Sequence, residues 1–276
     1  MSASADIPKF YLPFYYASLE NCWIFFKASP SHVEPLLKNK HLKPYIFEDG
    51  HTIVGLCFQQ FSSHNATTVT ELEFQVASFP ESQEGLLGER RWSEKEFLKG
   101  SDQAKILGFN RVVVLASNLY AVEAGKILFG ENKYLTTFDS TWPGLDAPPQ
   151  QREGWHFTVY DPENPNETIF SINVSVGAIL PVPANPAPLT LYDIKEGRLS
   201  CSKWNIYGAF DTYFFDDSQA DNAQVKIEYG NSNFEFGRDM RTAGIGLLGS
   251  GTRPFAIQSF QSPPVAVQSF AYYVRQ

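Results

Sequence analysis

Lys133 is the residue whose surroundings best suit covalent chemistry. It lies in the stretch AVEAGKILFGENKYLTTFD, residues 121–139, where a helical pattern ends and a strand-like pattern begins. Its neighbours in sequence are apolar or aromatic: Leu128, Phe129, Tyr134 and Leu135. A lysine held away from water loses its proton more easily than one in water, because burial disfavours the charged form, and the neutral amine is a nucleophile.

The size of the pKa shift decides whether Lys133 can react. At its reference pKa of about 10.4, a lysine is neutral in only about one molecule in 2,500 at pH 7. A lowering by about 3 units raises that fraction about a thousandfold. We expect such a lowering if no carboxylate pairs with the amine. The alternative is a surface lysine after a helix end, where its charge favours the helix dipole.

Glu71 and Glu73 form the second candidate group. The segment TVTELEFQVASF, residues 68–79, alternates as a strand does, and it places both glutamates on one face with Val69. Two carboxylates on one face point either to solvent or into a polar cavity. In a cavity, a buried carboxyl group can take up and release protons near neutral pH.

Other motifs are weaker. Arg238 and Arg241 lie three residues apart in FGRDMRTAG, a spacing that fits either a substrate carboxylate clamp or a surface turn. The five histidines show no HxH or HExxH spacing, and the three cysteines form no CxxC pair. We therefore expect no metal site and no disulfide framework.

The elements around Lys133 follow the order strand, helix, strand. RVVVLASNLY reads as a buried strand, and AVEAGKILFG has helical spacing and ends at Gly130. Beyond residue 140, β-like runs alternate with Pro, Gly, Asn and Asp clusters, and VAVQSFAYYVR at residues 265–275 is the last of these runs. We predict an α+β fold, mainly antiparallel β, within a single domain over residues 1–276.

The composition excludes several classes of function. The net charge of −8 and the pI near 5.2 oppose binding to nucleic acid or anionic lipid, since such partners need clustered Lys and Arg. No run reaches the roughly 18 to 20 apolar residues that span a bilayer. The segment MSASADIPKFYLPFYYASLE lacks the basic and apolar regions of a secretory signal. We expect a cytoplasmic protein that does not bind membranes.

The stretch LASNLYAVEAGKILFGENKY resembles the signature of the acetoacetate decarboxylase family, in which a strand leads to a short helix with a G-R-E motif and then a G-Y-P-K-K motif. Aligned without gaps, Gly125 and Gly130 take the motif glycines and Lys133 takes the first lysine of the pair. TVTELEFQVA is similar to the family's Y-x-E strand and places Glu71 on the active-site glutamate. The resemblance covers roughly residues 20 to 140.

This resemblance implies a function for the candidate residues. Lys133 would form a Schiff base with the ketone of a keto acid, and Glu71 would be the acid or base. Acetoacetate decarboxylase is itself a known example of an enzyme with a desolvated nucleophilic lysine, so this role is carried over from the family. Asn132 and Tyr134 would orient the intermediate, and Phe129, Glu73, Arg238 and Arg241 would bind the substrate. A curved sheet or barrel-like cone with a few short helices would enclose an apolar pocket, with no metal and no organic cofactor.

The sequence also departs from the family pattern. Asn132 replaces a proline, Tyr134 the second lysine and Glu131 a tyrosine, while the arginine thought to hold the substrate carboxylate aligns with an apolar residue near Leu19. Glu131 would raise the pKa of the amine if the side chains met. Two functions stay open: a Schiff-base-forming lyase with decarboxylase, aldol or dehydration chemistry, and a binding or cyclase-like protein for a lipophilic ligand. The family resemblance suggests a homo-oligomer.

Overall fold

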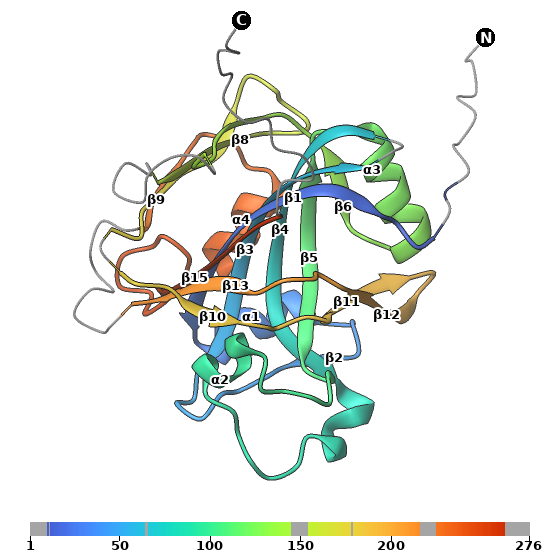
Figure 1. Ribbon diagram of the computed structural model, residues 1–276, viewed down its shortest axis with the longest axis vertical. Coiled ribbons are helices and arrows are strands. Elements are labelled where there is room, and N and C mark those ends of the chain that lie inside the picture. The colour runs from blue at the N-terminus through green and yellow to red at the C-terminus, as the bar shows by residue number, and fades with distance from the viewer. Residues whose placement is uncertain are drawn as a thin grey trace, which may run out of the picture.

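Figure 1 shows a computed structural model of the protein, which describes residues 10, 12–63, 66–144, 154–177, 179–215 and 225–262. Most described strands belong to one sheet with 11 strands. In spatial order its main path contains β10 (Val182–Ala184), β13 (Phe210–Phe214), β15 (Arg253–Gln261), β1 (Tyr16–Ala28), β3 (Thr52–Ser63), β4 (Ala66–Pro80), β5 (Gly108–Ala116), β11 (Leu189–Lys195) and β12 (Arg198–Trp204). Off this path, β2 (Leu42–Pro44) pairs with β4, and β6 (Lys133–Leu135) pairs with β5.

The remaining elements are a second sheet and a few short helices. The second sheet contains β14 (Val225–Tyr229), β9 (Thr168–Val174), β8 (Trp155–Tyr160) and β7 (Phe138–Thr141). The helices are α1 (Pro30–Leu37), α2 (Glu94–Lys99), α3 (Leu119–Ala124), α4 (Glu235–Thr242), the 3₁₀ helix η1 (Glu81–Leu86) and the π-helix η2 (Gly125–Phe129). No helix in the described part of the chain is both long and apolar enough to cross a lipid bilayer.

The strand pairing confirms the predicted α+β class with mainly antiparallel strands. Among the described strands, only the β5–β6 and β5–β11 pairs are parallel. The large sheet runs from β10 to β12 without these end strands pairing, so the described strands form an open sheet and not a closed barrel. The predicted strand over residues 265–275 lies outside the described residues.

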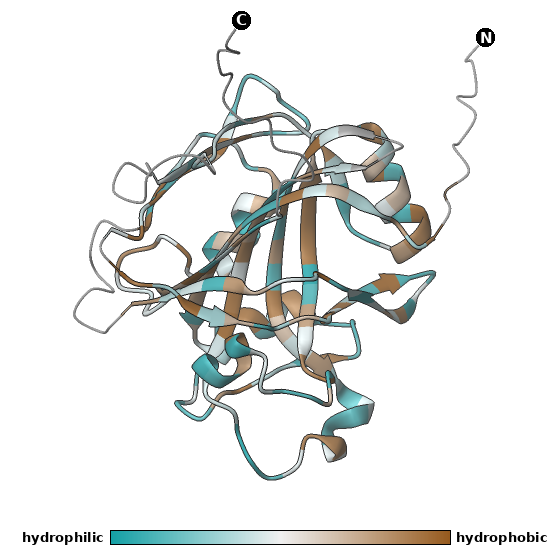
Figure 2. Cartoon of the chain, in the orientation of Figure 1, coloured by the Kyte–Doolittle hydropathy of each residue, from teal (hydrophilic) through white to brown (hydrophobic). Residues whose placement is uncertain are grey.

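The two faces of the large sheet bury two different cores. Its outer face carries Ile24, Phe58, Phe74 and Val113, and packs against the second sheet, α1 and α4. Its inner face is lined by Trp23, Cys57, Val69, Ala77 and Phe109. This division follows from the alternation of side chains along extended strands. Figure 2 shows the central strands as hydrophobic over much of their length.

The large sheet curves around its inner face. The rings of Tyr16 on β1 and Trp204 on β12 have centroids 6.5 Å apart, although four strands separate β1 from β12 in the sheet order. Because neighbouring strands lie about 4.8 Å apart, side chains from such distant strands can meet only if the sheet bends. The expected curved sheet is therefore present, and its concave side is available for a site.

Phe58 joins the two sheets and is a sensitive test of their packing. Its ring is fully buried and stacks on Phe157 of the second sheet, with ring centroids 3.9 Å apart. We expect Phe58→Ala to lower the free energy of unfolding by about 3–5 kcal/mol, because it leaves a cavity between the sheets. Urea denaturation measures this loss. Tyr207→Ala, at a position that is 90% exposed, should change it by less than about 0.5 kcal/mol, and equal losses would contradict the packing.

Candidate functional site

A pocket of about 130 Å³ lies on the inner face of the large sheet, beside α3, η2 and β6. Its wall is formed by segments far apart in the sequence. The lining residues are Phe14, Tyr16, Gln59, Phe61, Val69, Glu71, Glu73, Arg111, Tyr120, Ala121, Ala124, Gly125, Phe129, Glu131, Lys133, Leu191, Ser202, Lys203 and Trp204. The predicted residues Lys133, Glu71, Glu73 and Phe129 thus meet at one pocket.

Lys133 is buried in this pocket. It opens β6, which runs parallel to β5 with Lys133 opposite Val114. The preceding helix ends at Gly130, whose φ of 81° is in the left-handed region that favours glycine. This turn brings the chain back along β5, and the Lys133 side chain is only 5% exposed. The interior position predicted for Lys133 is confirmed.

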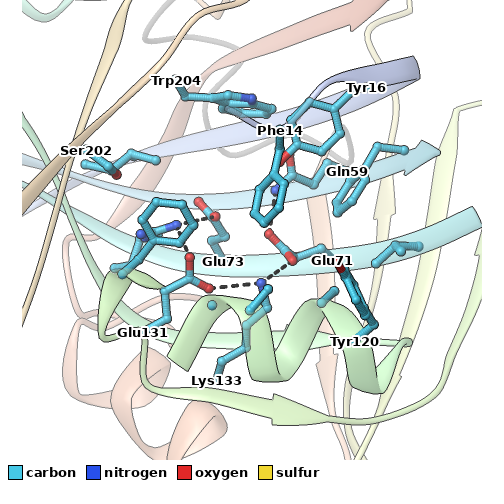
Figure 3. Close-up of a pocket in the computed structure, with 18 of the residues that line it drawn as sticks. Phe14, Tyr16, Gln59, Glu71, Glu73, Tyr120, Glu131, Lys133, Ser202 and Trp204 are labelled. Atoms are coloured by element: carbon cyan, nitrogen blue, oxygen red, sulfur yellow. Dashed lines mark hydrogen bonds and ion pairs between the residues drawn. The ribbon is translucent and has the colours of Figure 1, made fainter. Parts of the chain in front are cut away.

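The charge state of Lys133 differs from the expectation. Its Nζ lies 2.5 Å from Glu71 Oε2 and 2.9 Å from Glu131 Oε2 (Figure 3). Burial alone would lower the pKa of Lys133, but the negative charges of Glu131 and Glu71 outweigh burial and hold the pKa above its usual value. The expected lowering is therefore wrong, because two carboxylates pair with the amine. Lys133 rests as an ammonium ion.

Glu71 and Glu73 share one face of β4, as the alternation predicted, and of the two alternatives for that face the structure shows the pocket and not solvent. Both are buried, and Gln59 Nε2 on β3 donates a hydrogen bond of 2.8 Å to Glu71 Oε1. Burial, opposed by Arg111 and reinforced by the neighbouring carboxylates, raises the pKa of Glu73 to about 8. Gln75 Nε2 also donates a hydrogen bond to Glu73. Glu73 therefore keeps its proton at neutral pH and can donate it.

Arg111 is the main functional candidate that the sequence analysis missed. Its Nη1 lies 2.6 Å from Glu131 Oε1 and 3.6 Å from Glu73 Oε1. Its Nε donates to both oxygens of Asp193, at 3.2 and 3.1 Å, and its Nη2 also pairs with Asp193. A charged residue directly before the apolar run VVVLA was the available signal, whereas Asp193 lies 82 residues away.

A β-bulge turns Arg111 toward the pocket. On β5, Val113 pairs with Phe74 and Arg111 with Gln75, so Val112 has no opposite partner on β4. Without this extra residue, Arg111 would share a face with Val113, which packs in the outer core. The bulge therefore lets one strand supply both the outer core and the polar floor of the pocket.

Gly125 lets the helix approach the charged side chains. A Cβ at this position would lie 2.7 Å from Lys133 Cδ and closer still to a carboxylate oxygen of Glu131. Any side chain larger than hydrogen would thus displace the Glu131–Lys133 ion pair. This close approach explains the need for glycine at Gly125, which the resemblance aligned with a motif glycine.

Asn132 and Tyr134 do not reach the pocket. Along the extended chain, Glu131 and Lys133 face the pocket, and the residues between and after them face away. Asn132 is exposed and donates a hydrogen bond of 2.8 Å to Glu235 Oε1, while the Tyr134 ring packs edge-on against Phe234. Their expected contacts with the substrate are therefore not supported by their placement.

Arg238 and Arg241 also lie away from the pocket. Both belong to α4, which packs on the outer face of the large sheet, opposite the pocket. Arg238 is exposed, and Arg241 lies over the ring of Tyr229 at 5.0 Å. The sheet separates them from Lys133, so the suggested carboxylate clamp is wrong. Among the residues that the structure describes, no group of three or more His, Cys, Asp or Glu side chains is arranged to hold a metal ion.

Glu73 should make the stability of the protein depend on pH. Its pKa of about 8 in the folded state lies above the value of about 4.3 for an unfolded glutamate. The stabilisation from its proton is complete below about pH 4 and is lost as the pH rises to about 8. Relative to Glu73→Gln, the wild-type free energy of unfolding should fall by up to about 1.4 kcal/mol per pH unit in this window.

Chemical denaturation at pH 5, 6, 7 and 8 checks this expectation. The exposed Glu34 provides a matched control, and Glu34→Gln should leave the pH profile as in the wild type. Parallel profiles for wild type and Glu73→Gln would show that Glu73 is ionised in the folded protein across this range.

The fold of this chain is similar to that of several solved structures. No protein-family model matches the sequence, and no curated protein matches it. The fold is similar to that of the enduracididine biosynthesis enzyme MppR complexed with pyruvate, with a TM-score of 0.55, 11% identity, and coverage of 94% of this chain and 92% of that one.

Two further solved structures have the same fold. One is acetoacetate decarboxylase from Legionella pneumophila, with a TM-score of 0.52, 10% identity, and coverage of 93% of this chain and 90% of that one. The other is an acetoacetate decarboxylase-like enzyme from Sphingomonas wittichii RW1, with a TM-score of 0.50, 11% identity, and coverage of 88% and 86%. The chain therefore has the fold of the acetoacetate decarboxylase-like enzymes, as the resemblance in its sequence predicted.

Proposed function

We propose that this protein is an enzyme that forms a Schiff base between Lys133 and a small carbonyl compound, a class that includes keto acids. The observation that carries the proposal is a single buried amine in the pocket, within hydrogen-bonding distance of a carboxylate that can accept its proton. The surrounding fold is that of enzymes that handle such compounds. One of them is described as bound to pyruvate, and also to the condensation product of pyruvate and imidazole 4-carboxaldehyde.

The first step is a proton transfer from Lys133 to Glu71. The ammonium ion must lose a proton before it can attack, and Glu71 Oε2 is 2.5 Å away. In a site closed to water, a neutral amine and a neutral carboxylic acid are less disfavoured relative to the ion pair than they are in water, because two buried charges lose their hydration. A ligand that fills the pocket and displaces water therefore favours this transfer.

The subsequent steps balance with Glu71 alone. The neutral amine of Lys133 bonds to the carbonyl carbon, and the carbonyl oxygen takes the proton from Glu71. The nitrogen then returns a proton to Glu71, which delivers it to the departing hydroxyl group, and water leaves. The product is an iminium ion that keeps the positive charge of the former ammonium ion. It would stand beside the same two carboxylates, Glu71 and Glu131, which favour that charge.

The iminium ion sets the range of reactions that can follow. It draws electrons from a bond next to the former carbonyl carbon, which supports decarboxylation, aldol addition or cleavage, and dehydration. The site lacks the second lysine and the arginine clamp of the decarboxylase pattern, since Tyr134 aligns with that lysine and an apolar residue near Leu19 aligns with that arginine. We therefore propose the shared iminium step and not one of these outcomes.

Borohydride trapping tests the proposal. With a panel of small ketones, aldehydes and keto acids, reduction should fix an adduct on Lys133 that is detected by peptide mass. The yield should rise with pH, because the pKa of the amine is raised and its neutral fraction grows toward higher pH. Lys133→Arg keeps the positive charge but cannot form the imine, and it should give no adduct. An adduct on other lysines only, or none with any compound, would refute the proposal.

A second candidate function is non-catalytic or cyclase-like binding of a lipophilic ligand in the same pocket. The ion pairs of Lys133 with Glu71 and Glu131 favour it, because they stabilise the unreactive ammonium form. In that case, ligands should bind equally well to the wild type and to Lys133→Arg, and borohydride should trap nothing. The same experiment thus separates the two functions.

A further inference from the structure

The floor of the pocket carries more acidic than basic groups. Two cations, Lys133 and Arg111, lie among four carboxyl groups, all buried in the folded protein: Glu71, Glu73, Glu131 and Asp193. Burial raises the pKa of Glu73 to about 8, so three carboxylates face two cations at neutral pH. These buried groups therefore have an excess of negative charge, and the exposed Lys203 of the lining adds one positive charge outside them.

Each nitrogen of Arg111 already has a carboxyl group of the protein beside it. Its Nη1 is engaged by Glu131 and Glu73, and its Nε and Nη2 are both engaged by Asp193. Recognition of a substrate carboxylate by arginine normally uses two parallel N–H donors of the guanidinium group. In this site the Asp193 carboxylate already occupies the pair of donors formed by Nε and Nη2 of Arg111.

The two lysines of the lining are engaged as well. Lys133 Nζ contacts Glu71 and Glu131. Lys203 Nζ donates hydrogen bonds to the backbone oxygen of Lys105, at 2.8 Å, and to Thr190 Oγ1, at 2.6 Å. An incoming anion would compete with two carboxylates for Lys133 and would also meet the excess negative charge of the buried groups. Like charges brought together in a desolvated site cost several kcal/mol.

The rest of the wall suits a ligand without negative charge. Aromatic side chains line much of the pocket, among them Phe14, Tyr16, Phe61, Phe129 and Trp204. Figure 3 shows Tyr16 and Trp204 across from Lys133. Such rings attract apolar groups and cations. Gln59 Oε1 is buried and accepts no hydrogen bond from the described residues. The volume of about 130 Å³ is close to that of a cavity that holds one benzene ring.

We infer that the substrate of this site is an uncharged or positively charged carbonyl compound of about one ring in size, and that the pocket selects against carboxylates. This inference rests on the proposed function for the carbonyl group, and on the geometry of Arg111, Lys133 and Lys203 for the charge. Within the class of small carbonyl compounds proposed above, this charge selection excludes keto-acid anions as substrates. The selectivity comes from the carboxylates that already pair with the buried cations Arg111 and Lys133.

The charge selection is tested with three ligands that have similar shapes but different charges. Pentane-2,4-dione is uncharged, acetoacetate replaces one of its methyl groups with an anionic oxygen, and 4-aminobutan-2-one carries a protonated amine. Calorimetry at pH 7 gives their dissociation constants for the wild type and for Lys133→Arg, which cannot form an imine. We expect the dione and the aminoketone to bind at least about tenfold more tightly than acetoacetate in both proteins.

Asp193→Asn tests the cause of the selectivity. It removes one negative charge and frees part of this donor pair of Arg111, so acetoacetate should bind about tenfold more tightly than in the wild type while the dione is unaffected. Glu34→Gln, an exposed carboxylate away from the pocket lining, should change neither affinity. This control separates a local effect from a change in the net charge of the protein.

The outcomes distinguish the two proposals. Acetoacetate binding as tightly as the dione, or no binding of either the dione or the aminoketone, would overturn the charge selection, even if borohydride trapped an adduct. Charge selection in both proteins without any trapped adduct in the wild type would overturn the Schiff-base step and support the selection on its own.

Discussion

Glu131→Gln is expected to speed the chemical modification of Lys133 at pH 7 by about ten- to a thousandfold. Glu131 Oε2 lies 2.9 Å from the amine and is one of two carboxylates that keep it protonated. An opposite charge at such a distance shifts a pKa by about 1 to 3 units, so its removal raises the neutral fraction of the amine by the corresponding factor. Reductive methylation with formaldehyde, followed by peptide mass, measures the rate at Lys133.

The methylation rate at Lys226 is an internal reference in each sample. Lys226 is exposed on β14, far along the chain from the pocket, and its rate should be the same in the wild type and in Glu131→Gln. The rate at Lys133 should rise with pH in the wild type and in Glu131→Gln, since the Lys133 amine loses its proton above neutral pH in both proteins. An unchanged rate at Lys133 would show that Glu131 does not hold its proton, and that the effect of Glu71 is sufficient.

Arg111→Met is expected to lower the free energy of unfolding by about 3–5 kcal/mol at pH 7. The change leaves the buried carboxyl groups of Asp193, Glu131 and Glu73 without their shared cation, and an uncompensated buried charge is strongly destabilising. The loss should be smaller at pH 5 than at pH 7, because the carboxyl groups take up protons as the pH falls. Urea denaturation at both pH values measures it.

Two further variants show whether the charge is the cause. Arg198→Met changes an exposed arginine of β12 and should alter the stability by less than about 0.5 kcal/mol. Adding Asp193→Asn to Arg111→Met removes one of the unpaired charges, so the double variant should recover part of the loss. A double variant less stable than Arg111→Met would indicate that Arg111 acts through packing and not through its charge.

The local rules of strand geometry predicted part of the site. Alternation along residues 68–79 correctly placed Glu71 and Glu73 on one face, and the apolar neighbours and the family resemblance correctly predicted a buried Lys133. The same alternation explains why Asn132 and Tyr134 fail as substrate contacts. Residues next to Lys133 in an extended strand point to the opposite side, whereas Glu131, two residues away, points to the same side. The side of the strand to which a residue points, and not its distance from Lys133 in the sequence, decides whether it reaches the pocket.

The long-range contacts could not be predicted from the sequence. Arg111 meets Asp193 because β11 lies beside β5 in parallel, and no turn signal specifies the pairing of strands 82 residues apart. The bulge at Val112 leaves no mark in the run RVVV. The sequence named Glu71 and Glu131 as candidate neighbours of Lys133 but could not show that both contact its amine, so the direction of its pKa shift stayed open. The α+β class was predictable from periodicity, while the open form of the large sheet was not.

The bulge in β5 has an evolutionary consequence. Because Val112 is an extra residue, Arg111 and Val113 point to opposite faces of the sheet. A substitution at Val113 therefore changes the outer core, and a substitution at Arg111 changes the pocket. A scaffold divided in this way can diverge in chemistry while its architecture persists, which fits a chain that keeps a shared fold at about one identical residue in ten.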